Sequence, residues 1–75
     1  MSNKKEVATF AENLRKCMKE KDISLQRLSR HTKLDYSSLH RHYSGTTKGI
    51  QFHVLGPVCR ALGTSPNDLI PWESS

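Results

Sequence analysis

Four side chains near the middle of the sequence have the types and the spacing of a surface that reads DNA bases. They are Tyr36, Ser37, His40 and Arg41. On a helix, residues three and four positions apart share a face, so these four point to one side while Leu39 points to the other. Arg41 can form a bidentate pair with guanine O6 and N7, whereas Ser37 can bond to several bases and specifies little. The pattern predicts base contacts in the major groove of duplex DNA.

The aromatic member of this set has three open interpretations. The ring of Tyr36 could contact a thymine methyl group, or its hydroxyl could bond to a phosphate. Tyr36 could also be a half-buried surface aromatic without a binding role. Ser38, in the same helix, is expected either to help pack the helix or to reach a phosphate.

Two other stretches carry groups suited to phosphates, which supply most of the affinity of a protein for DNA. A helix that starts at Ser24 offers free backbone N–H groups and the positive end of its dipole beside Gln26 and Arg27. A later loop combines hydroxyls, an ammonium group and backbone amides. Ordinary solvated charge is the alternative for Arg27 and Lys48. The side chains expected to contact phosphates are Gln26, Arg27, Lys33, Ser38, Thr46, Thr47 and Lys48.

The histidines and cysteines do not have the spacing of a metal site or a catalytic pair. His40 and His42 are two positions apart, about 200° around a helix axis, so they cannot bind one ion together. The sequence contains no Cys-x-x-Cys and no His-x-x-x-His pair. Cys17 and Cys59 lie on apolar helical faces, where a thiol is more typical of core packing than of nucleophilic catalysis. We therefore expect no metal, no cofactor and no enzymatic activity.

Two short helices are expected to position the DNA-reading side chains. The first, over residues 25–31, has Leu25 and Leu28 on one face. The second, over residues 36–43, follows a turn at 32–34. Favourable caps for these helices are Ser24 and Asp35 at the starts and Gly45 at the end. This layout predicts a helix-turn-helix, in which one helix braces and the other reads DNA.

Three further helices are expected to form a bundle around this motif. Apolar residues spaced three and four apart predict one over about 6–20 and one between Phe52 and Leu62. Gly56-Pro57 leaves open whether the latter helix kinks or whether residues 51–55 form a separate turn before it. A short last helix should begin after Ser65, with Leu69 and Ile70 closing the core. No stretch alternates with period two, so no sheet is predicted.

The composition is compatible with a small basic domain. The chain has 75 residues, a net charge of +5 and a pI near 9.6. Such a balance suits nucleic acid, although an acidic protein or a membrane surface would also attract it. Two cysteines are too few for a secreted disulfide scaffold. With no apolar run near the ~20 residues of a membrane span and no signal peptide, a cytoplasmic protein is expected.

The order and spacing of these helices resemble the XRE/Cro-type family, the DNA-binding domains of lambda-type phage repressors. The resemblance covers about residues 7–70. The residues that carry it are Leu28 and Ser29, Leu34, Asp35 and Leu39, Tyr43-Ser44-Gly45, and the stretch KGIQFHVLGPVCRALGTSPNDLI. The chain differs from the family at Lys33, where glycine is usual, and at His42, where many members have a small or acidic residue. A left-handed conformation would cost Lys33 roughly 1 kcal/mol.

The resemblance implies an all-α, five-helix lambda-repressor-like bundle and a transcriptional regulator, more often a repressor than an activator. It also implies a homodimer on a palindromic operator. Trp72 is expected either to cap the core or to join a dimer interface. The expected boundaries are a flexible N-terminus over 1–5, the domain over 6–72 and a tail over 73–75. The alternative function is a protein-interaction module, antitoxin-like or adaptor, with weak or no specific DNA binding.

Overall fold

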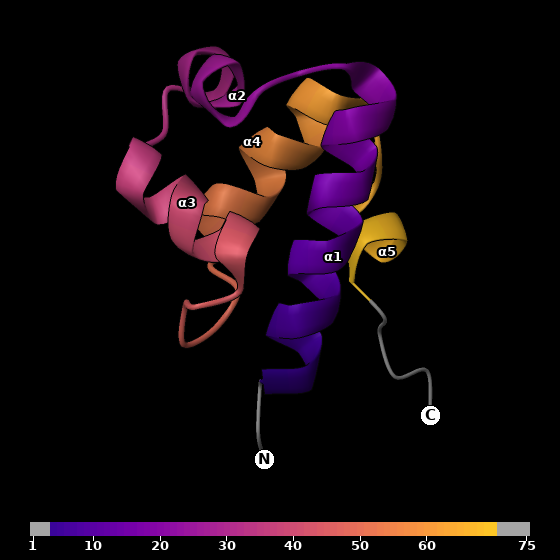
Figure 1. Ribbon diagram of the computed structural model, residues 1–75, viewed down its shortest axis with the longest axis vertical. Coiled ribbons are helices and arrows are strands. Elements are labelled where there is room, and N and C mark those ends of the chain that lie inside the picture. The colour runs from indigo at the N-terminus through magenta and orange to yellow at the C-terminus, as the bar shows by residue number, and fades with distance from the viewer. Residues whose placement is uncertain (1–3, 71–75) are drawn as a thin grey trace.

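The structure, a computed structural model, describes residues 4–70, and it confirms the all-α prediction (Figure 1). The helices of this part of the chain are α1 (Lys4–Lys21), α2 (Leu25–Thr32), α3 (Tyr36–Ser44), α4 (Phe52–Leu62) and α5 (Pro66–Leu69). Trp72, the residue expected to cap the core or to join a dimer interface, lies outside the described residues.

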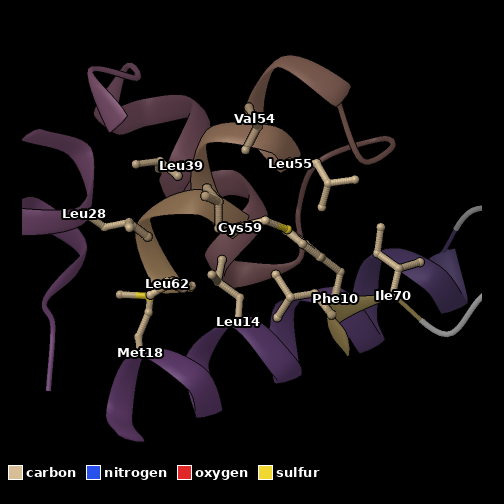
Figure 2. Close-up of a cluster of buried hydrophobic side chains, with 12 residues drawn as sticks. Phe10, Leu14, Met18, Leu28, Leu39, Val54, Leu55, Cys59, Leu62 and Ile70 are labelled. Carbon is tan, nitrogen blue, oxygen red and sulfur yellow. The ribbon is translucent and has the colours of Figure 1, made fainter. Parts of the chain in front are cut away.

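The helices pack around one apolar core, in which α3 contacts both α1 and α2, and α4 packs against α1 and α2 (Figure 1). Residues from all five helices contribute to this core (Figure 2). Its members are Phe10, Leu14, Met18, Leu28, Leu39, Val54, Leu55, Val58, Cys59, Leu62, Leu69 and Ile70. Leu28 and Leu39 are the fully buried members from α2 and α3, and Leu25 and Tyr43 pack against the cluster from the same two helices. The exposed faces of both short helices stay available for contacts outside the bundle.

The first helix is longer than expected. It begins at Lys4 rather than near residue 6, so Lys4 and Lys5 are helical. Extending an existing helix adds backbone hydrogen bonds without the unfavourable step of nucleating a new one. The first two buried positions are Val7 and Phe10, as the spacing predicted.

The fourth helix resolves the alternatives at Gly56-Pro57. Residues Phe52–Leu62 form one helix with Pro57 inside it, so the separate-turn alternative is wrong. Gly56 lacks the Cβ that would clash with the ring of a following proline in a helix. Phe52, the first apolar residue of the spacing that predicted this helix, does not join the core. Its side chain is 82% exposed, and Val54 is fully buried instead.

Three other local predictions are confirmed. Gly45 and Gly63 end α3 and α4 with positive φ values of 78° and 65°. Ser65 precedes α5, and its backbone N–H donates to the Asp68 carboxylate at 3.4 Å. Hydrogen bonds from Thr64 and Ser65 lower the pKa of Asp68.

Across residues 4–70, no helix has both the length and the apolar character that a membrane crossing requires.

Lys33 adopts the left-handed conformation that the turn requires, with φ 61° and ψ 23°. This region costs a non-glycine residue roughly 1–2 kcal/mol, whereas glycine enters it freely but loses more backbone entropy on folding. Lys33→Gly is therefore expected to raise the free energy of unfolding by about 0.5–1 kcal/mol. Urea denaturation followed by circular dichroism measures the change.

Lys48→Gly is the matched control, because Lys48 also lies in a connecting segment but has no positive φ. The same substitution there should lower the stability slightly through backbone entropy. Equal losses in both variants would show that the left-handed turn stores no strain at Lys33.

Candidate nucleic-acid interface

The outward side of α3 brings the predicted base-reading residues together. Tyr36, Ser37, His40 and Arg41 are all exposed, and they line one shallow hollow on the surface. The rings of Tyr36 and His40 are stacked, with centroids 6.2 Å apart and an interplanar angle of 24°. Tyr36 is 49% exposed, so neither its ring nor its hydroxyl is withdrawn into the core. The four side chains therefore form one polar and aromatic surface.

The opposite side of α3 is fixed to the bundle. Leu39 is fully buried, and His42 is 1% exposed. The His42 Nδ1 lies 2.8 Å from the carbonyl oxygen of Ser38, and its Nε2 accepts from the backbone N–H of Gln51 at 3.3 Å. The His42 ring also meets Phe10 edge-on, with centroids 5.9 Å apart. These contacts hold α3 at a set rotation, which presents the hollow to the outside.

The start of α2 forms a second shallow hollow with cationic walls. Ser24 is the N-cap, and its Oγ accepts from the backbone N–H of Arg27 at 3.1 Å. The hollow is lined by Ser24, Gln26, Arg27 and Arg30. The sequence analysis missed Arg30, although its place four residues after Gln26 puts both on one helical face. A helix N-terminus flanked by two guanidinium groups is suited to an anion.

Side-chain hydrogen bonds hold the turn before α3 against the end of α2. The Ser29 Oγ donates to the Leu34 carbonyl at 2.8 Å, across the turn. The Thr32 Oγ1 donates to the Leu28 carbonyl at 2.8 Å and accepts from the Leu34 N–H at 3.3 Å. Asp35 is the N-cap of α3 by its extended backbone, but its side chain makes no capping bond. The prediction of a side-chain cap there is wrong.

The loop after α3 is more internally bonded than the sequence suggested. The Thr46 backbone N–H donates to the Arg41 carbonyl at 2.9 Å, so this amide serves the end of α3 rather than the surface. The Thr47 Oγ1 donates to the Gly49 carbonyl at 3.0 Å. The Thr46 hydroxyl pairs with the Ser44 hydroxyl at 3.0 Å, and Lys48 is exposed. Lys48 is thus the most available group of this loop for a charged ligand.

The remaining predicted contacts differ in exposure. Lys33 is exposed at the turn between α2 and α3. Ser38 is half-buried, and its carbonyl oxygen faces His42. These positions agree with a packing role for Ser38 and a solvent-facing ammonium group for Lys33.

Acidic residues are scarce in the part of the chain that contains α2, α3 and α4, so this segment carries a net positive charge. Residues 25–62 include six Lys or Arg residues and a single acidic residue, Asp35. A surface of one sign attracts a polyanion and raises its rate of encounter. The two shallow hollows lie within this cationic segment, apart from Ser24 at its edge.

A family model described as the Cro/C1-type HTH DNA-binding domain matches residues 13–75. The match spans most of the chain, including all of α2 to α5. The chain belongs to this family. Membership in the Cro/C1-type family assigns the α2–α3 unit as a DNA-binding helix-turn-helix, and it confirms the resemblance drawn from the sequence.

A solved structure shares the fold of this Cro/C1-type domain. It is the clp gene regulator ClgR from Corynebacterium glutamicum, with a TM-score of 0.73 and 24% sequence identity. The similarity covers 88% of this chain and 67% of that chain. Among curated proteins, no match to the chain is found.

The cysteines and histidines of the Cro/C1-type domain are not gathered into one site. Within residues 4–70, no three His, Cys, Asp or Glu side chains are placed to hold a metal ion. Burial raises the pKa of the Cys59 thiol, which keeps it protonated and a poor nucleophile. His40 is exposed on α3 while His42 is buried, consistent with their separation around the helix axis.

Proposed function

We propose that the chain is a transcriptional regulator, acting as a repressor, that binds duplex DNA sequence-specifically as a homodimer. The observation that carries this proposal is the hollow of Tyr36, Ser37, His40 and Arg41 on the free side of α3. Its opposite side is fixed by Leu39 and His42. A rigidly held helix with a polar outer face is suited to insertion into the major groove.

The base contacts are assigned by donor and acceptor chemistry. Arg41 pairs with guanine O6 and N7 through two parallel N–H donors. His40 and Ser37 bond to neighbouring base edges, and Tyr36 packs on a thymine methyl group beside them. Because Tyr36 and His40 are stacked, they present one continuous surface to the groove.

The phosphate contacts surround this surface. The start of α2 binds one phosphate through its backbone N–H groups, with Gln26, Arg27 and Arg30 around it. Lys33 and Lys48 contribute exposed ammonium groups, while Thr46 and Thr47 contribute hydroxyls near Lys48. Half-buried Ser38 mainly helps to pack α3 against the bundle, and its hydroxyl is the group that could bond to a phosphate.

Arg27→Ala is expected to weaken binding to all duplexes alike. Removing one phosphate contact reduces the slope of log K against log salt concentration by about 0.9 without changing which site is preferred. Fluorescence anisotropy with labelled duplexes at several salt concentrations measures this slope. A variant that lost preference for one sequence while keeping the wild-type slope would place Arg27 on a base instead.

The dimer is proposed from size and geometry. A bundle of 75 residues buries little apolar surface, and association would add to it. A two-fold dimer would place two copies of α3 about 34 Å apart on one side of the duplex, which favours a palindromic operator. Trp72, together with the outer faces of α4 and α5, is proposed to supply this interface.

Selection of bound duplexes from a random DNA pool tests the function. The proposal predicts one enriched sequence with two symmetric half-sites, bound by two chains per duplex. Enrichment of a single asymmetric half-site would retain sequence-specific recognition and reject the dimer. A pool that shows no enrichment at moderate salt would contradict the proposed function.

The second candidate function is a protein-interaction module, and the exposed ring of Phe52 is the observation that favours it. This side chain is 82% exposed at the start of α4, and it belongs to neither shallow hollow. An exposed aromatic residue is a typical anchor of a protein interface. This candidate predicts a duplex affinity that does not depend on sequence.

A further inference from the structure

Arg15 of α1 contacts the C-terminal end of α3, 28 residues later in the chain. Its Nη1 donates to the carbonyl oxygen of Tyr43 at 2.6 Å. Its guanidinium carbon also lies 5.9 Å from the centre of the Tyr43 ring, above the ring face. Arg15 is exposed, and it joins α1 to the helix that carries the base-reading residues.

The contact satisfies one of the exposed carbonyls at the end of α3. The last four carbonyls of a helix have no partner within the helix. The Arg41 carbonyl accepts from the backbone N–H groups of Gly45 and Thr46, and the Tyr43 carbonyl accepts from Arg15. A cation at this end of a helix is also favoured by the helix dipole. Arg15 therefore holds the last turn of α3 through a hydrogen bond and through charge.

A row of three rings leads from Arg15 to the base-reading surface. Tyr43 and His40 have ring centroids 6.4 Å apart, and His40 and Tyr36 are separated by 6.2 Å. The spacing of three and four residues places the three rings along one side of α3. Tyr43 also packs against the apolar core. A shift of the Tyr43 ring would therefore displace the His40 ring that it contacts, and with it the Tyr36 ring stacked on His40.

We propose that Arg15 is a positioning residue that fixes the last turn of α3 and the ring row, in addition to the contacts of Leu39 and His42, so that DNA sequence discrimination depends on α1. The inference rests on the proposed function, because discrimination requires that α3 reads bases. Arg15 acts through Tyr43 and the stacked rings rather than through a bond to DNA. Its loss removes no cation from the two hollows proposed to contact DNA, but it releases the support that orients the His40 and Tyr36 rings.

The test compares Arg15→Ala with Lys16→Ala, using the selected duplex and an unrelated duplex of equal length. Lys16→Ala is the matched control, because it removes one exposed cation from α1 beside Arg15. Both variants are measured at a temperature where circular dichroism shows each to be folded. Arg15→Ala is expected to lower the ratio of specific to non-specific affinity roughly tenfold, within the range of measured couplings between residues that do not touch the ligand. Lys16→Ala should leave this ratio unchanged.

Two further readouts separate positioning from other roles. The salt slope of Arg15→Ala should equal that of Lys16→Ala, whereas a phosphate contact would reduce it by about 0.9. In the free protein, Arg15→Ala should shift the proton resonances of the Tyr36 and His40 rings, and Lys16→Ala should not. Arg15→Lys, which keeps the charge and one donor but loses the planar group over Tyr43, should recover part of the ratio.

The outcomes distinguish failure of this inference from failure of the proposed function. A wild-type chain that discriminates, with a ratio that survives Arg15→Ala, would overturn only the role of Arg15. A ratio that falls together with the salt slope would also overturn it, by making Arg15 a phosphate contact. A wild-type chain that prefers no duplex would overturn the proposed function, and the role of Arg15 with it.

Discussion

His42→Ala is expected to lower the free energy of unfolding by about 3 kcal/mol, a large part of the stability of so small a domain. The side chain is fully enclosed, with 1% of its surface exposed. Its removal leaves a cavity beside Phe10, whose ring meets the imidazole edge-on at 5.9 Å. It also removes the hydrogen-bond acceptor of the partly buried Gln51 backbone N–H. Urea denaturation followed by circular dichroism at 222 nm measures the loss.

The hydrogen bonds of His42 define one neutral tautomer. The Ser38 carbonyl can only accept, so His42 Nδ1 carries the proton and donates to it at 2.8 Å. Nε2 is then an acceptor, and the Gln51 N–H donates to it at 3.3 Å. Gln51 is the N-cap residue of α4. The imidazole therefore joins the middle of α3 to the start of α4 across the intervening loop.

His42→Phe separates the cavity from the hydrogen bonds. Phenylalanine keeps a ring beside Phe10 but gives the Gln51 N–H no acceptor, so a loss of about 1–3 kcal/mol is expected. His53→Ala is the control, because His53 is exposed on α4 and its removal should change the stability by less than about 0.5 kcal/mol. A His42→Phe variant as stable as the wild type would show that packing alone accounts for the histidine.

The helix-turn-helix could be predicted from the sequence because its signals are local. The cap at Ser24, the apolar spacing of Leu28 and Leu39 and the glycine at position 45 all act within a few residues. These local predictions were confirmed because the chain has few other ways to place those residues. The left-handed conformation of Lys33 was not among them, since comparison with the usual glycine indicated only what that conformation would cost.

The contacts that the sequence could not predict join distant segments. Arg15 and Tyr43 are 28 residues apart, and nothing in the spacing of α1 marks one of its exposed cations as a partner of α3. His42 pairs with Gln51 across a loop whose course no pattern defines. The exposure of Phe52 could not be predicted, because the apolar spacing of α4 includes Phe52 at the helix start. In the structure, Val54 packs into the core instead. These features depend on the docking of helices rather than on local preference.

Arg41→Ala is expected to weaken binding to the selected duplex by about 1–3 kcal/mol, a loss of roughly 5- to 150-fold. The loss should concentrate at one guanine position, since a bidentate arginine reads a single base pair. Affinities for the selected duplex and its single-base variants, measured by anisotropy, show where discrimination is lost. The fold should remain intact, because the Arg41 side chain is exposed.

Arg60→Ala is the matched control for this experiment. Arg60 is also exposed, but it lies on α4 and lines a hollow with His31 and Thr32 away from the base-reading set. Its removal should leave the preference at every base position unchanged. If Arg41→Ala also kept the full wild-type preference, the assignment of α3 as the base-reading helix would be wrong at its most informative side chain.

The most direct measurement is a titration of the nitrogen-15-labelled protein with the selected duplex, followed by amide resonances. We predict that the largest shifts occur at the start of α2 and along the outward side of α3, at Gln26, Arg27, Tyr36, Ser37, His40 and Arg41. The surface of α1 and α5 around Asn13, Lys16 and Asp68 should change little. Shifts concentrated on that surface, with α3 unperturbed, would contradict the account that α3 reads DNA.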